Sequence, residues 1–359
     1  MWCKQCNIET NASVCPVCGD TTVEDLPVEV YWCERCHTPI INTAVQADKG
    51  SCPVCGGKTK YLAADLRPVF PEERLLVELL LNKEPNSLWE ESVWANNNRY
   101  YINGKAISMP NSIYETANVD SIIKKLNECS SKNGYDAFDR HIETFILANH
   151  SRLEYLKDEA FQFIKKASSK FPAENIVVSF SGGKDSTVSA DLAVKALSDP
   201  CLVHIYGDTT LEFPSTAEYA ERFRAAHPNA IFQIAKNDEQ DFYDVCEDIG
   251  PPARMMRWCC SMFKTGPITR VINSMYGSQQ ILTFYGIRKA ESVSRSKYNR
   301  IEDSAEAVKI KQQTVASPIF FWKDIDIWLY LNLYSFHYSL NNFQDLLLLL
   351  NQEIHQNYL

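Results

Sequence analysis

Long apolar runs are missing from this chain. Its run of leucines at Leu346–Leu350 has five residues, whereas a helix that crosses a membrane needs about 20 apolar residues. The first residues, Met1–Cys6, lack the basic segment and the apolar segment that together form a secretion signal. We therefore expect a cytoplasmic protein with no membrane partner.

The chain also has fewer basic than acidic residues. The chain has 36 Lys and Arg residues against 45 Asp and Glu residues, which gives a net charge of −9. This balance argues against a protein that wraps nucleic acid over its whole surface, but it leaves room for a local basic groove. With 359 residues, of which 45% are hydrophobic, the chain is long enough for two or three domains with full cores. The composition predicts no particular oligomeric state.

Cysteine, in contrast, is abundant, with 13 residues. In a reducing compartment this number indicates metal ligands or redox groups rather than disulfides. Eight of the cysteines form four C-x-x-C pairs, and two such pairs close a tetrahedral zinc shell. The predicted ligands are Cys3, Cys6, Cys15 and Cys18 for one zinc, and Cys33, Cys36, Cys52 and Cys55 for the other.

These two zinc ribbons are predicted to be structural. Structural zinc contributes on the order of 10 kcal/mol of folding free energy to a module that is too short to hold its own core. Four thiolates complete each shell, so we expect His37, next to Cys36, to stay outside it. A redox role of the pairs is the less favoured alternative. The ribbons also suit contact with RNA, DNA or a protein partner, and the sequence does not separate such docking from a spacer role.

After the ribbons we expect a small mixed unit and then a catalytic domain. The predicted limits are 1–66 for the two ribbons, 67–138 for a mixed α+β unit, 139–335 for the catalytic domain and 336–359 for a divergent or truncated tail. The mixed unit has a predicted helix at 72–81 and a predicted hairpin turn at Asn103–Gly104. Its aromatic residues are expected to pack in the interior rather than to stack on bases: Trp89, Trp94, Tyr100 and Tyr101. A helical pattern covers 139–170.

Strand and helix patterns alternate from residue 176 onward. The predicted strands are 176–180, 202–207, 230–235 and 280–286, and the predicted helices are 186–197, 214–227, 265–276 and 322–334. Such alternation predicts an α/β fold with a doubly wound parallel sheet. In this fold the ligand lies at the carboxyl ends of the strands.

The most specific segment is S-G-G-K-D-S at 181–186, between the first of these strands and its helix. A strand, a glycine turn and a helix start direct backbone N–H groups and the positive end of the helix dipole at one point, which suits phosphate. Gly182 and Gly183 let the backbone approach an anion, and Lys184 adds a positive charge. The spacing is not that of the Walker A loop. The alternative is an ordinary glycine turn before a helix.

Two further segments follow predicted strands at the same edge of the sheet. Asp208, after the second strand, is a candidate ligand for Mg²⁺ or a ribose hydroxyl, with Glu212 as a weaker one and a capping or turn role as the alternative. Arg288 and Arg295, after a later strand, suit bidentate binding of phosphate or sulfate oxygens. We expect Glu291 to orient one of them; the alternative for this segment is a solvated charged face.

A pair of adjacent cysteines, Cys259 and Cys260, lies between Arg257 and Lys264. We expect this positive field to lower the thiol pKa values and to favour thiolate. Thiolates flanked by cations suit a metal cluster or sulfur chemistry. The alternative is two buried structural cysteines.

Five segments together resemble the phosphoadenosine phosphosulfate (PAPS) reductase family, within the PP-loop ATP-pyrophosphatase superfamily. They are SFSGGKDS (179–186), GDTTLEFP (207–214), RWCCSMFKTGP (257–267), GIRKAESVSR (286–295) and SPIFFWKDIDIWLYL (317–331). They occur in family order, cover roughly 176–335, and with the ribbons look like the longer archaeal and bacterial forms of the family.

The resemblance implies an adenine nucleotide, ATP or PAPS/APS, bound with Mg²⁺. The predicted nucleotide-binding residues are Ser181, Gly182, Gly183, Lys184, Asp185, Ser186, Asp208, Arg288 and Arg295. The predicted catalytic residues are Lys184, Asp185, Asp208, Cys259 and Cys260. The resemblance also implies that Cys259 and Cys260 ligate a four-iron, four-sulfur cluster, of which they form only half the ligand set.

The sequence departs from the family in one respect, because no cysteine follows Cys260. The family completes its cluster with a downstream C-x-x-C, and its reductases carry a nucleophilic cysteine in a tail motif. Reduction of an adenylylated sulfate needs such a thiolate to attack sulfur. Either the chain is truncated or divergent at its end, or a partner completes the site, or the reaction differs. An intact S-G-G-K-D-S suits ATP, whose pyrophosphate leaves.

Three hypotheses of function follow. The leading one is a PAPS-reductase-like enzyme of sulfur metabolism that binds ATP or an adenylylated sulfate for adenylyl activation or for sulfur transfer or reduction. The second is sulfur insertion into nucleic acid, either DNA phosphorothioation or tRNA thiolation, with the ribbons holding the substrate. The third is a nucleotide-binding scaffold without catalysis.

Overall fold

The computed structural model describes residues 1–10, 12–24, 27–43, 50–110, 113, 118–129, 134–212, 214–253, 256–302, 310 and 312–334. The chain forms two compact units, one with Met1–Glu154 and the segment that begins at Lys323, the other with Tyr155–Trp322. The first unit thus contains residues 139–154 and 323–334, which the sequence analysis assigns to the catalytic domain. The four predicted domain limits stay a prediction, and the predicted tail at 336–359 lies outside the described residues.

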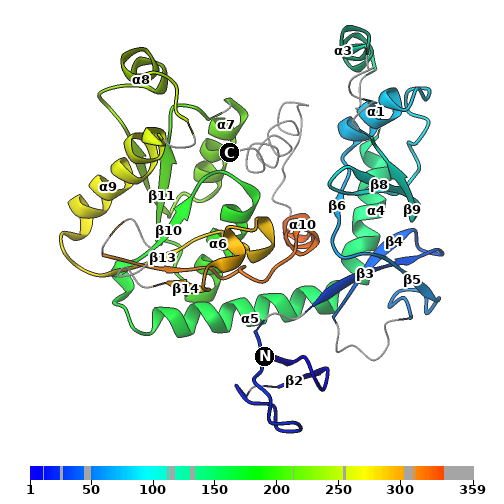
Figure 1. The fold of residues 1–359 in the computed structure, drawn as a ribbon, viewed down its shortest axis with the longest axis horizontal. Coiled ribbons are helices and arrows are strands. Elements are labelled where there is room, and N and C mark those ends of the chain that lie inside the picture. Colours follow the sequence, from blue (N-terminus) through cyan, green and yellow to red (C-terminus); the bar gives the residue numbers. More distant parts are fainter. Residues whose placement is uncertain are drawn as a thin grey trace. The chain divides into compact units, whose positions relative to one another are not determined.

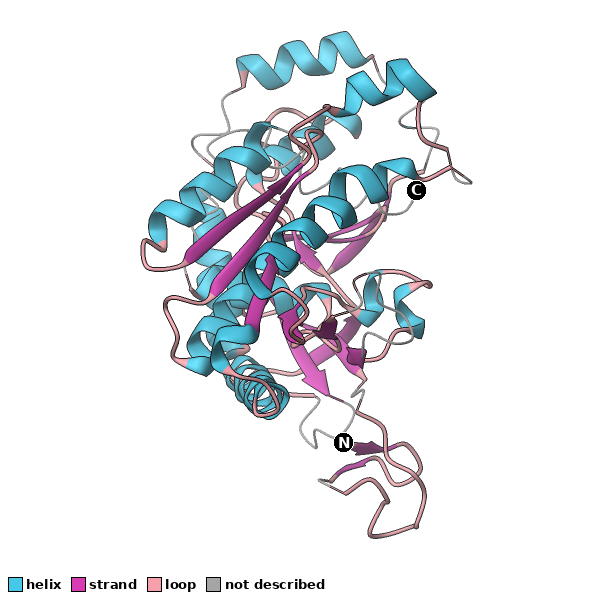
Figure 2. Cartoon of the chain, turned by 90° about the vertical axis from the view of Figure 1, so that its left-hand side faces the viewer, coloured by secondary structure: helices cyan, strands magenta, loops and turns pink. Residues whose placement is uncertain are grey.

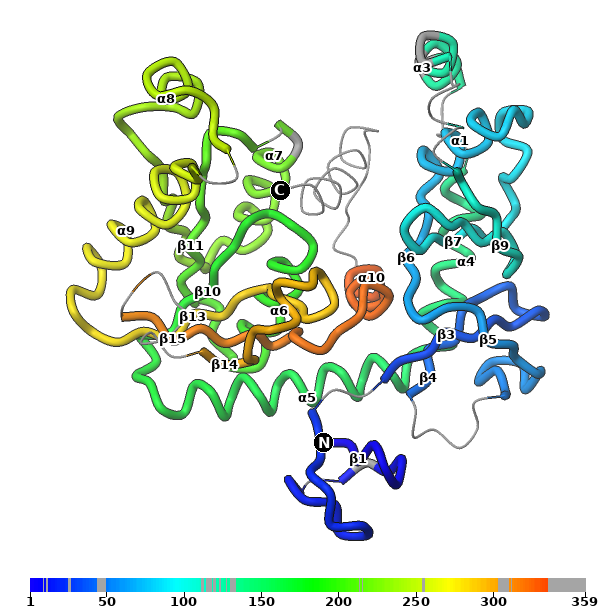
Figure 3. The backbone as a smooth tube through the Cα atoms, in the orientation of Figure 1, coloured from blue at the N-terminus to red at the C-terminus, as the bar shows by residue number. Residues whose placement is uncertain are grey.

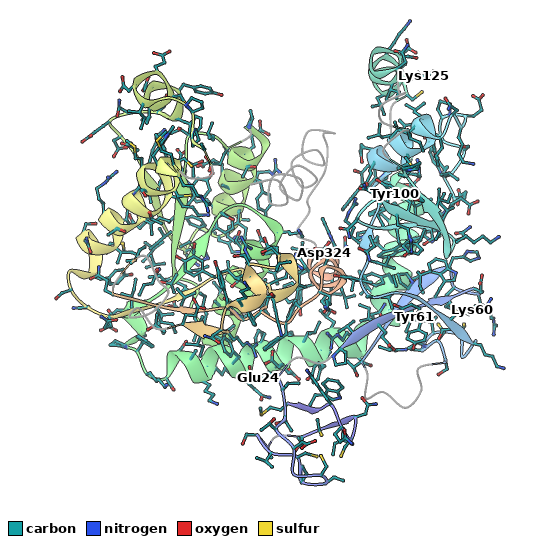
Figure 4. The ribbon with its side chains drawn as sticks, in the orientation of Figure 1. Glu24, Lys60, Tyr61, Tyr100, Lys125 and Asp324 are labelled. Carbon is teal, nitrogen blue, oxygen red and sulfur yellow. The ribbon has the colours of Figure 1, made fainter. Side chains whose placement is uncertain are left out.

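The N-terminal cysteine pairs lie on short antiparallel hairpins in the first unit (Figure 1). In the first hairpin β1 (Trp2–Cys3) pairs with β2 (Ile8–Glu9). In the second ribbon β3 (Val28–Cys33) lies between β4 (Thr38–Thr43) and β5 (Thr59–Ala63). Lys60 and Tyr61 of β5 are exposed (Figure 4). Trp32 of β3 is buried. Cys33, Ile40 and Cys52 of the second ribbon pack in one cluster with Ala148, so the core of this ribbon extends to a residue outside it.

A four-stranded antiparallel sheet with two helices follows in the same unit. Its elements are β6 (Arg67–Pro68), α1 (Pro71–Leu80), β7 (Val93–Asn96), β8 (Arg99–Ile102), β9 (Lys105–Ser108) and α3 (Val119–Glu128). Asn103 and Gly104 join β8 to β9 with φ of 47° and 74°, so the predicted hairpin turn is confirmed. Trp94, Tyr100 and Tyr101 are buried, which confirms the predicted packing for these three rings. Trp89 is half-buried, with the Arg74 guanidinium over its ring.

The helical pattern predicted at 139–170 forms two helices, α4 (Tyr135–Ala148) and α5 (His150–Ser168). They separate at the buried Asn149, whose side-chain amide donates to the carbonyls of Phe145 and Pro39 and accepts from the N–H of Ile41. Asn149 therefore ends α4 and binds it to β4. The hydrophobic period continues through this residue, which is why the sequence does not reveal the break. Of the helices that the structure describes, none combines the length and the apolar character needed to cross a membrane.

The helix α10 (Asp324–Leu333) belongs to the first unit. The Asp65 carboxylate accepts hydrogen bonds from the N–H groups of Asp324 and Ile325 and so caps its N-terminus. Its Asp326 forms an ion pair with Arg152 of α5, with 3.1 Å between Nη2 and Oδ2. Both side chains are buried, so the pair is a structural contact within this unit.

The second unit is built on a six-stranded sheet in the order β12-β11-β10-β13-β15-β14. Figure 2 shows the strands in magenta and the helices in cyan. Its strands are β10 (Ile176–Phe180), β11 (Val203–Asp208), β12 (Ile231–Lys236), β13 (Ile281–Phe284), β14 (Ile301–Glu302) and β15 (Gln313–Ala316). Its helices are α6 (Lys184–Leu197), α7 (Pro214–Ala226), α8 (Phe242–Ile249) and α9 (Gly266–Tyr276). All strands run parallel except β14. The sequence does not predict β14 and β15, which are short and mix polar with apolar residues.

Helices cover both faces of this sheet. On one face Ile268 and Ile272 of α9 pack against Val177, Ile205 and Ala235 of three neighbouring strands. On the other, the ring of Phe223 in α7 stacks on Phe180 of β10, with 4.5 Å between the ring centroids. Burial there lowers the pKa of His204 to about 4, so this histidine is a neutral core residue. The predicted doubly wound α/β fold is therefore confirmed.

Candidate functional site

The loop between β10 and α6 has the geometry expected of an anion-binding turn. Gly182 has a φ of +74°, in the left-handed region, and a Cβ there would lie 3.0 Å from Cγ2 of Thr216. Gly183 is the N-cap of α6, with φ of −84° and ψ of 161°, and no side chain caps the helix at that position. The first turn of α6 therefore starts directly at Lys184, with its N–H groups at the carboxyl edge of the sheet.

Hydrogen bonds inside the loop hold its shape. The Ser186 hydroxyl donates to the carbonyl of Gly183 at 2.9 Å and accepts from the N–H of Ser181 at 3.2 Å. The Thr187 hydroxyl also donates to Gly183, at 3.0 Å, and lies 3.1 Å from the hydroxyl of Tyr219. Ser186 is buried and Ser181 is exposed. The buried Ser186 therefore stabilises the loop through its hydrogen bonds, and Ser181 is exposed to solvent.

This loop lies at the topological switch point of the sheet. From β10 the chain continues to β11 and β12 on one side, and then returns to β13 on the other side of β10 (Figure 3). The segments that follow β10 and β13 thus start side by side at the carboxyl edge, where ligands of such sheets bind. The backbone at Gly286, after β13, lies very close to the backbone at Asp185 in α6. A Cβ on Gly286 would lie only 2.5 Å from the carbonyl carbon of Asp185.

The charged residues predicted after β13 come together with the loop. Nε of Arg288 donates to the carboxylate of Asp185 at 3.0 Å, and Arg288 is only 4% exposed. Arg295 forms an ion pair with Glu291, which is the orienting role expected of that glutamate. Burial lowers the pKa of Arg295, and the Asp185 carboxylate counteracts this effect, so Arg295 is also near the loop. Asp185, Arg288 and Arg295 thus form one cluster.

Asp208 is the last residue of β11, at the same edge. Its carboxylate accepts from the N–H of Thr210 at 2.9 Å and lies 3.4 Å from Nζ of Lys236, the neighbouring residue at the end of β12. Glu212 accepts two hydrogen bonds from Thr209, at 3.0 and 2.8 Å. Both carboxylates therefore stabilise the turn after β11. Asp208 is partly exposed at the carboxyl edge of the sheet.

Cys259 and Cys260 begin a π-helical segment at Cys260–Thr265. Nη2 of Arg257 lies 3.4 Å from Sγ of Cys260, so the predicted cationic neighbour is in place. Burial and the adjacent Cys260 nevertheless raise the pKa of the Cys259 thiol, and Arg257 only partly counteracts them. The expectation of a lowered pKa is therefore wrong for Cys259, because desolvation outweighs the positive field.

The metal-ligand geometry separates the cysteines into two kinds. Among the residues that the structure describes, the groups of three or more His, Cys, Asp or Glu close enough to share a metal are the two N-terminal cysteine sets. Cys259 and Cys260 belong to neither set. The described residues around these two thiols thus offer no third ligand that could share a single metal ion with them.

The two N-terminal sets have the spacing of a tetrahedral metal site. Sγ of Cys3 lies 3.5 Å from that of Cys18, and Sγ of Cys33 lies 3.5 Å from that of Cys55. A tetrahedral shell with Zn–S bonds of about 2.3 Å needs a sulfur–sulfur separation of about 3.8 Å. The pKa values differ within each set: backbone N–H groups lower those of Cys15 and Cys55 to about 7, whereas the Cys18 thiol raises the pKa of Cys6 and burial raises that of Cys36. Each set thus fits a thiolate-ligated metal, and His37 is in neither.

The sequence analysis did not single out three residues at this edge. Gly286 contacts the first turn of α6, Lys236 pairs with Asp208, and Thr216 packs against Gly182. Gly286 ends one predicted strand and Lys236 directly follows another, so their positions in the sequence could have indicated that they lie at this edge. Thr216 comes from the first turn of α7, and only the packing of that helix brings it to the loop.

Known proteins resemble this chain over about half of its length. Residues 175–340 match the family model of the phosphoadenosine phosphosulfate reductase domain. Two uncharacterized proteins of Methanocaldococcus jannaschii are each 33% identical to the chain, over 55% and 53% of its length. The chain spans 39% and 45% of those two relatives, which is less than half of each. A phosphoadenylyl-sulfate (PAPS) reductase from Candida auris, solved as a phosphate complex, aligns with 53% of this chain and 88% of its own, with a TM-score of 0.39 and 16% identity.

Proposed function

From the match of residues 175–340 to the phosphoadenosine phosphosulfate reductase domain, we propose that the protein is a PP-loop enzyme that binds ATP and releases pyrophosphate. The observation that carries the proposal is the turn at 181–186, which starts α6 at the switch point of a parallel sheet. There the backbone N–H groups and the helix dipole favour phosphate.

Lys184 and Arg295 supply the positive charge in this proposal. Lys184 is the first residue of α6, and Arg295 lies in the cluster around Asp185. Their charges oppose the negative charge that grows on the departing pyrophosphate, which is the main form of catalysis in phosphoryl and adenylyl transfer. Asp208 is the residue that would hold Mg²⁺, whose charge would add to the same effect.

The cysteine pair favours ATP over an adenylylated sulfate as the substrate. Reduction of an adenylylated sulfate needs a thiolate that attacks sulfur. Burial raises the pKa of Cys259, which disfavours its thiolate form. The loop, in contrast, carries every residue of the S-G-G-K-D-S pattern. We therefore place the chemistry at the phosphates of ATP, with sulfur metabolism as the setting that the domain family suggests.

Both N-terminal cysteine sets are proposed to hold structural zinc. Each offers four sulfur ligands within 4.8 Å of one another. Zinc with four thiolates has no open position, so it would fold the ribbons without taking part in the reaction.

The test is nucleotide binding and turnover by the full chain with Mg²⁺. ATP should bind by isothermal titration calorimetry, and AMP and pyrophosphate should form. Lys184→Ala should weaken both by about tenfold or more, because one charge–phosphate contact is lost. Lys195→Ala is the matched control: Lys195 lies in the last turn of the same helix, paired with Asp191 at 2.6 Å, and its loss should leave ATP binding unchanged. Tight binding of PAPS together with no binding of ATP would contradict the proposal.

A further inference from the structure

Arg288 was predicted to bind the anionic end of the substrate, but its surroundings point to another role. Its side chain is 5% exposed, and Nε lies 3.0 Å from Oδ1 of Asp185. The Asp185 side chain is 15% exposed. The Arg288 guanidinium is thus held inside the protein against the loop's only carboxylate, whereas the Arg295 side chain is 31% exposed.

The backbone fixes this pair in place. A Cβ on Gly286 would lie 2.6 Å from both the carbonyl oxygen of Asp185 and the N–H nitrogen of Ser186. The segment after β13 is therefore in direct contact with the first turn of α6, two residues before Arg288. The N–H of Lys289, next in the chain, donates to the carbonyl of Phe320 at 2.8 Å. Arg288 is thus anchored by the backbone on both sides.

The charge of Asp185 matters because of its position. It is the second residue of α6, in the turn whose N–H groups face the proposed phosphates. An unpaired carboxylate there would repel a nucleotide with several negative charges, since charges a few ångströms apart interact strongly where water is excluded. A guanidinium against that carboxylate cancels the repulsion and keeps its oxygens turned away from the ligand.

We propose that Arg288 is a positioning residue, which fixes and neutralises the Asp185 carboxylate so that the first turn of α6 accepts an anionic nucleotide. This inference rests on the proposed function, because it takes ATP as the ligand of the loop. It assigns direct contact with the anion to Lys184 and Arg295, and an indirect role to Arg288.

The test compares ligands of increasing charge. Binding of AMP, ADP and ATP is measured by calorimetry for the wild type, Arg288→Gln, Arg288→Lys and the double variant Asp185→Asn/Arg288→Gln. Arg288→Gln leaves Asp185 unpaired, so the loss of affinity should grow with ligand charge, from about threefold for AMP to more than about tenfold for ATP. Arg288→Lys keeps the charge and should retain most of the ATP affinity. The double variant removes both charges and should bind ATP within about threefold of the wild type.

The control is Arg300→Gln. Arg300 is another arginine of the same unit with a 10% exposed side chain, in a bidentate pair with Glu159 and over the ring of Phe163 at 3.8 Å. Its loss should lower thermal stability without any dependence of affinity on ligand charge. If Arg288→Gln does not fold, a double variant that binds ATP more than about tenfold more weakly than the wild type would overturn the inference instead.

Two outcomes would overturn the inference. One is an equal loss of AMP and ATP affinity in Arg288→Gln, which is what a purely structural role predicts. The other is a double variant that binds ATP no better than Arg288→Gln. A wild-type chain that binds none of the three nucleotides would instead contradict the proposed function, so the two failures are distinguishable.

Discussion

Gly286 is the residue at which the loop after β13 contacts the first turn of α6. A Cβ at this position would lie 2.5–2.6 Å from three backbone atoms of Asp185 and Ser186. Backbone atoms cannot move aside as a flexible side chain can, so any larger residue here must displace the start of α6. The loop at 181–186 therefore depends on a glycine outside the S-G-G-K-D-S segment.

We predict that Gly286→Ala lowers the free energy of unfolding by about 1–3 kcal/mol, the usual range for an added methyl group in a packed site. It should also weaken ATP binding, because the N–H groups of the first turn are displaced. Thermal denaturation and calorimetry measure the two effects. Gly207→Ala is the stability control, since its Cβ would meet only Cδ1 of Ile268, at an ordinary 3.6 Å. Equal melting temperatures for the two variants would contradict the account of Gly286.

The roles of single residues were only partly predictable from sequence. The order of residues at 181–186 predicted the loop, because a glycine turn between a strand and a helix has few alternatives. The burial of Arg288 was not predictable, because it depends on the side-by-side placement of β10 and β13, which are distant in sequence. The burial of Cys259 was not predictable from sequence either. The sequence therefore predicted a lowered pKa for this thiol, whereas burial raises it.

At the level of elements, the two cysteine ribbons differ in how they join their surroundings. Cys33 and Cys52 of the second ribbon pack in one cluster with Ile40 and Ala148, so the ribbon shares a core with α4. Asn149 adds hydrogen bonds from the end of α4 to β4. The backbone hydrogen bonds described for the first hairpin join residues within 1–23. Metal in the second ribbon should therefore stabilise more of the first unit than metal in the hairpin.

This difference predicts unequal effects of two matched variants. Cys15→Ser and Cys52→Ser should each reduce the zinc content from about two to about one per chain. Cys52→Ser should lower the melting temperature of the first unit markedly, because structural zinc contributes on the order of 10 kcal/mol to such modules. Cys15→Ser should change it little. Metal analysis and circular dichroism measure both, and equal melting temperatures would contradict the shared core.

Element boundaries were predicted well where a cap or a turn residue marks them. Asn103–Gly104 adopts the positive φ angles that its residue types favour, and the strands and helices of the parallel sheet lie close to the predicted ranges. The break at Asn149 was missed because its cause is a hydrogen bond to β4, more than 100 residues away in sequence. Tertiary contacts of this kind leave no local pattern.

At the level of the whole molecule, alternation of strands and helices predicted the sheet, and the switch point follows from its strand order. The grouping of α10 with the N-terminal residues was not predictable, because Asp65 and Arg152 bind it through contacts that span more than 150 residues. The central claim of this account is that an adenine nucleotide binds where the segments after β10 and β13 meet.

Hydrogen–deuterium exchange of the full chain, with and without ATP and Mg²⁺, tests that claim most directly. Bound phosphates would accept hydrogen bonds from the N–H groups at the start of α6 and stabilise the segment that contacts it. We predict slower exchange in peptides that cover 179–190 and 284–290 when ATP is present, and unchanged exchange in peptides from 1–66. Unchanged exchange at 179–190 under saturating ATP, or protection confined to the ribbons, would contradict the account.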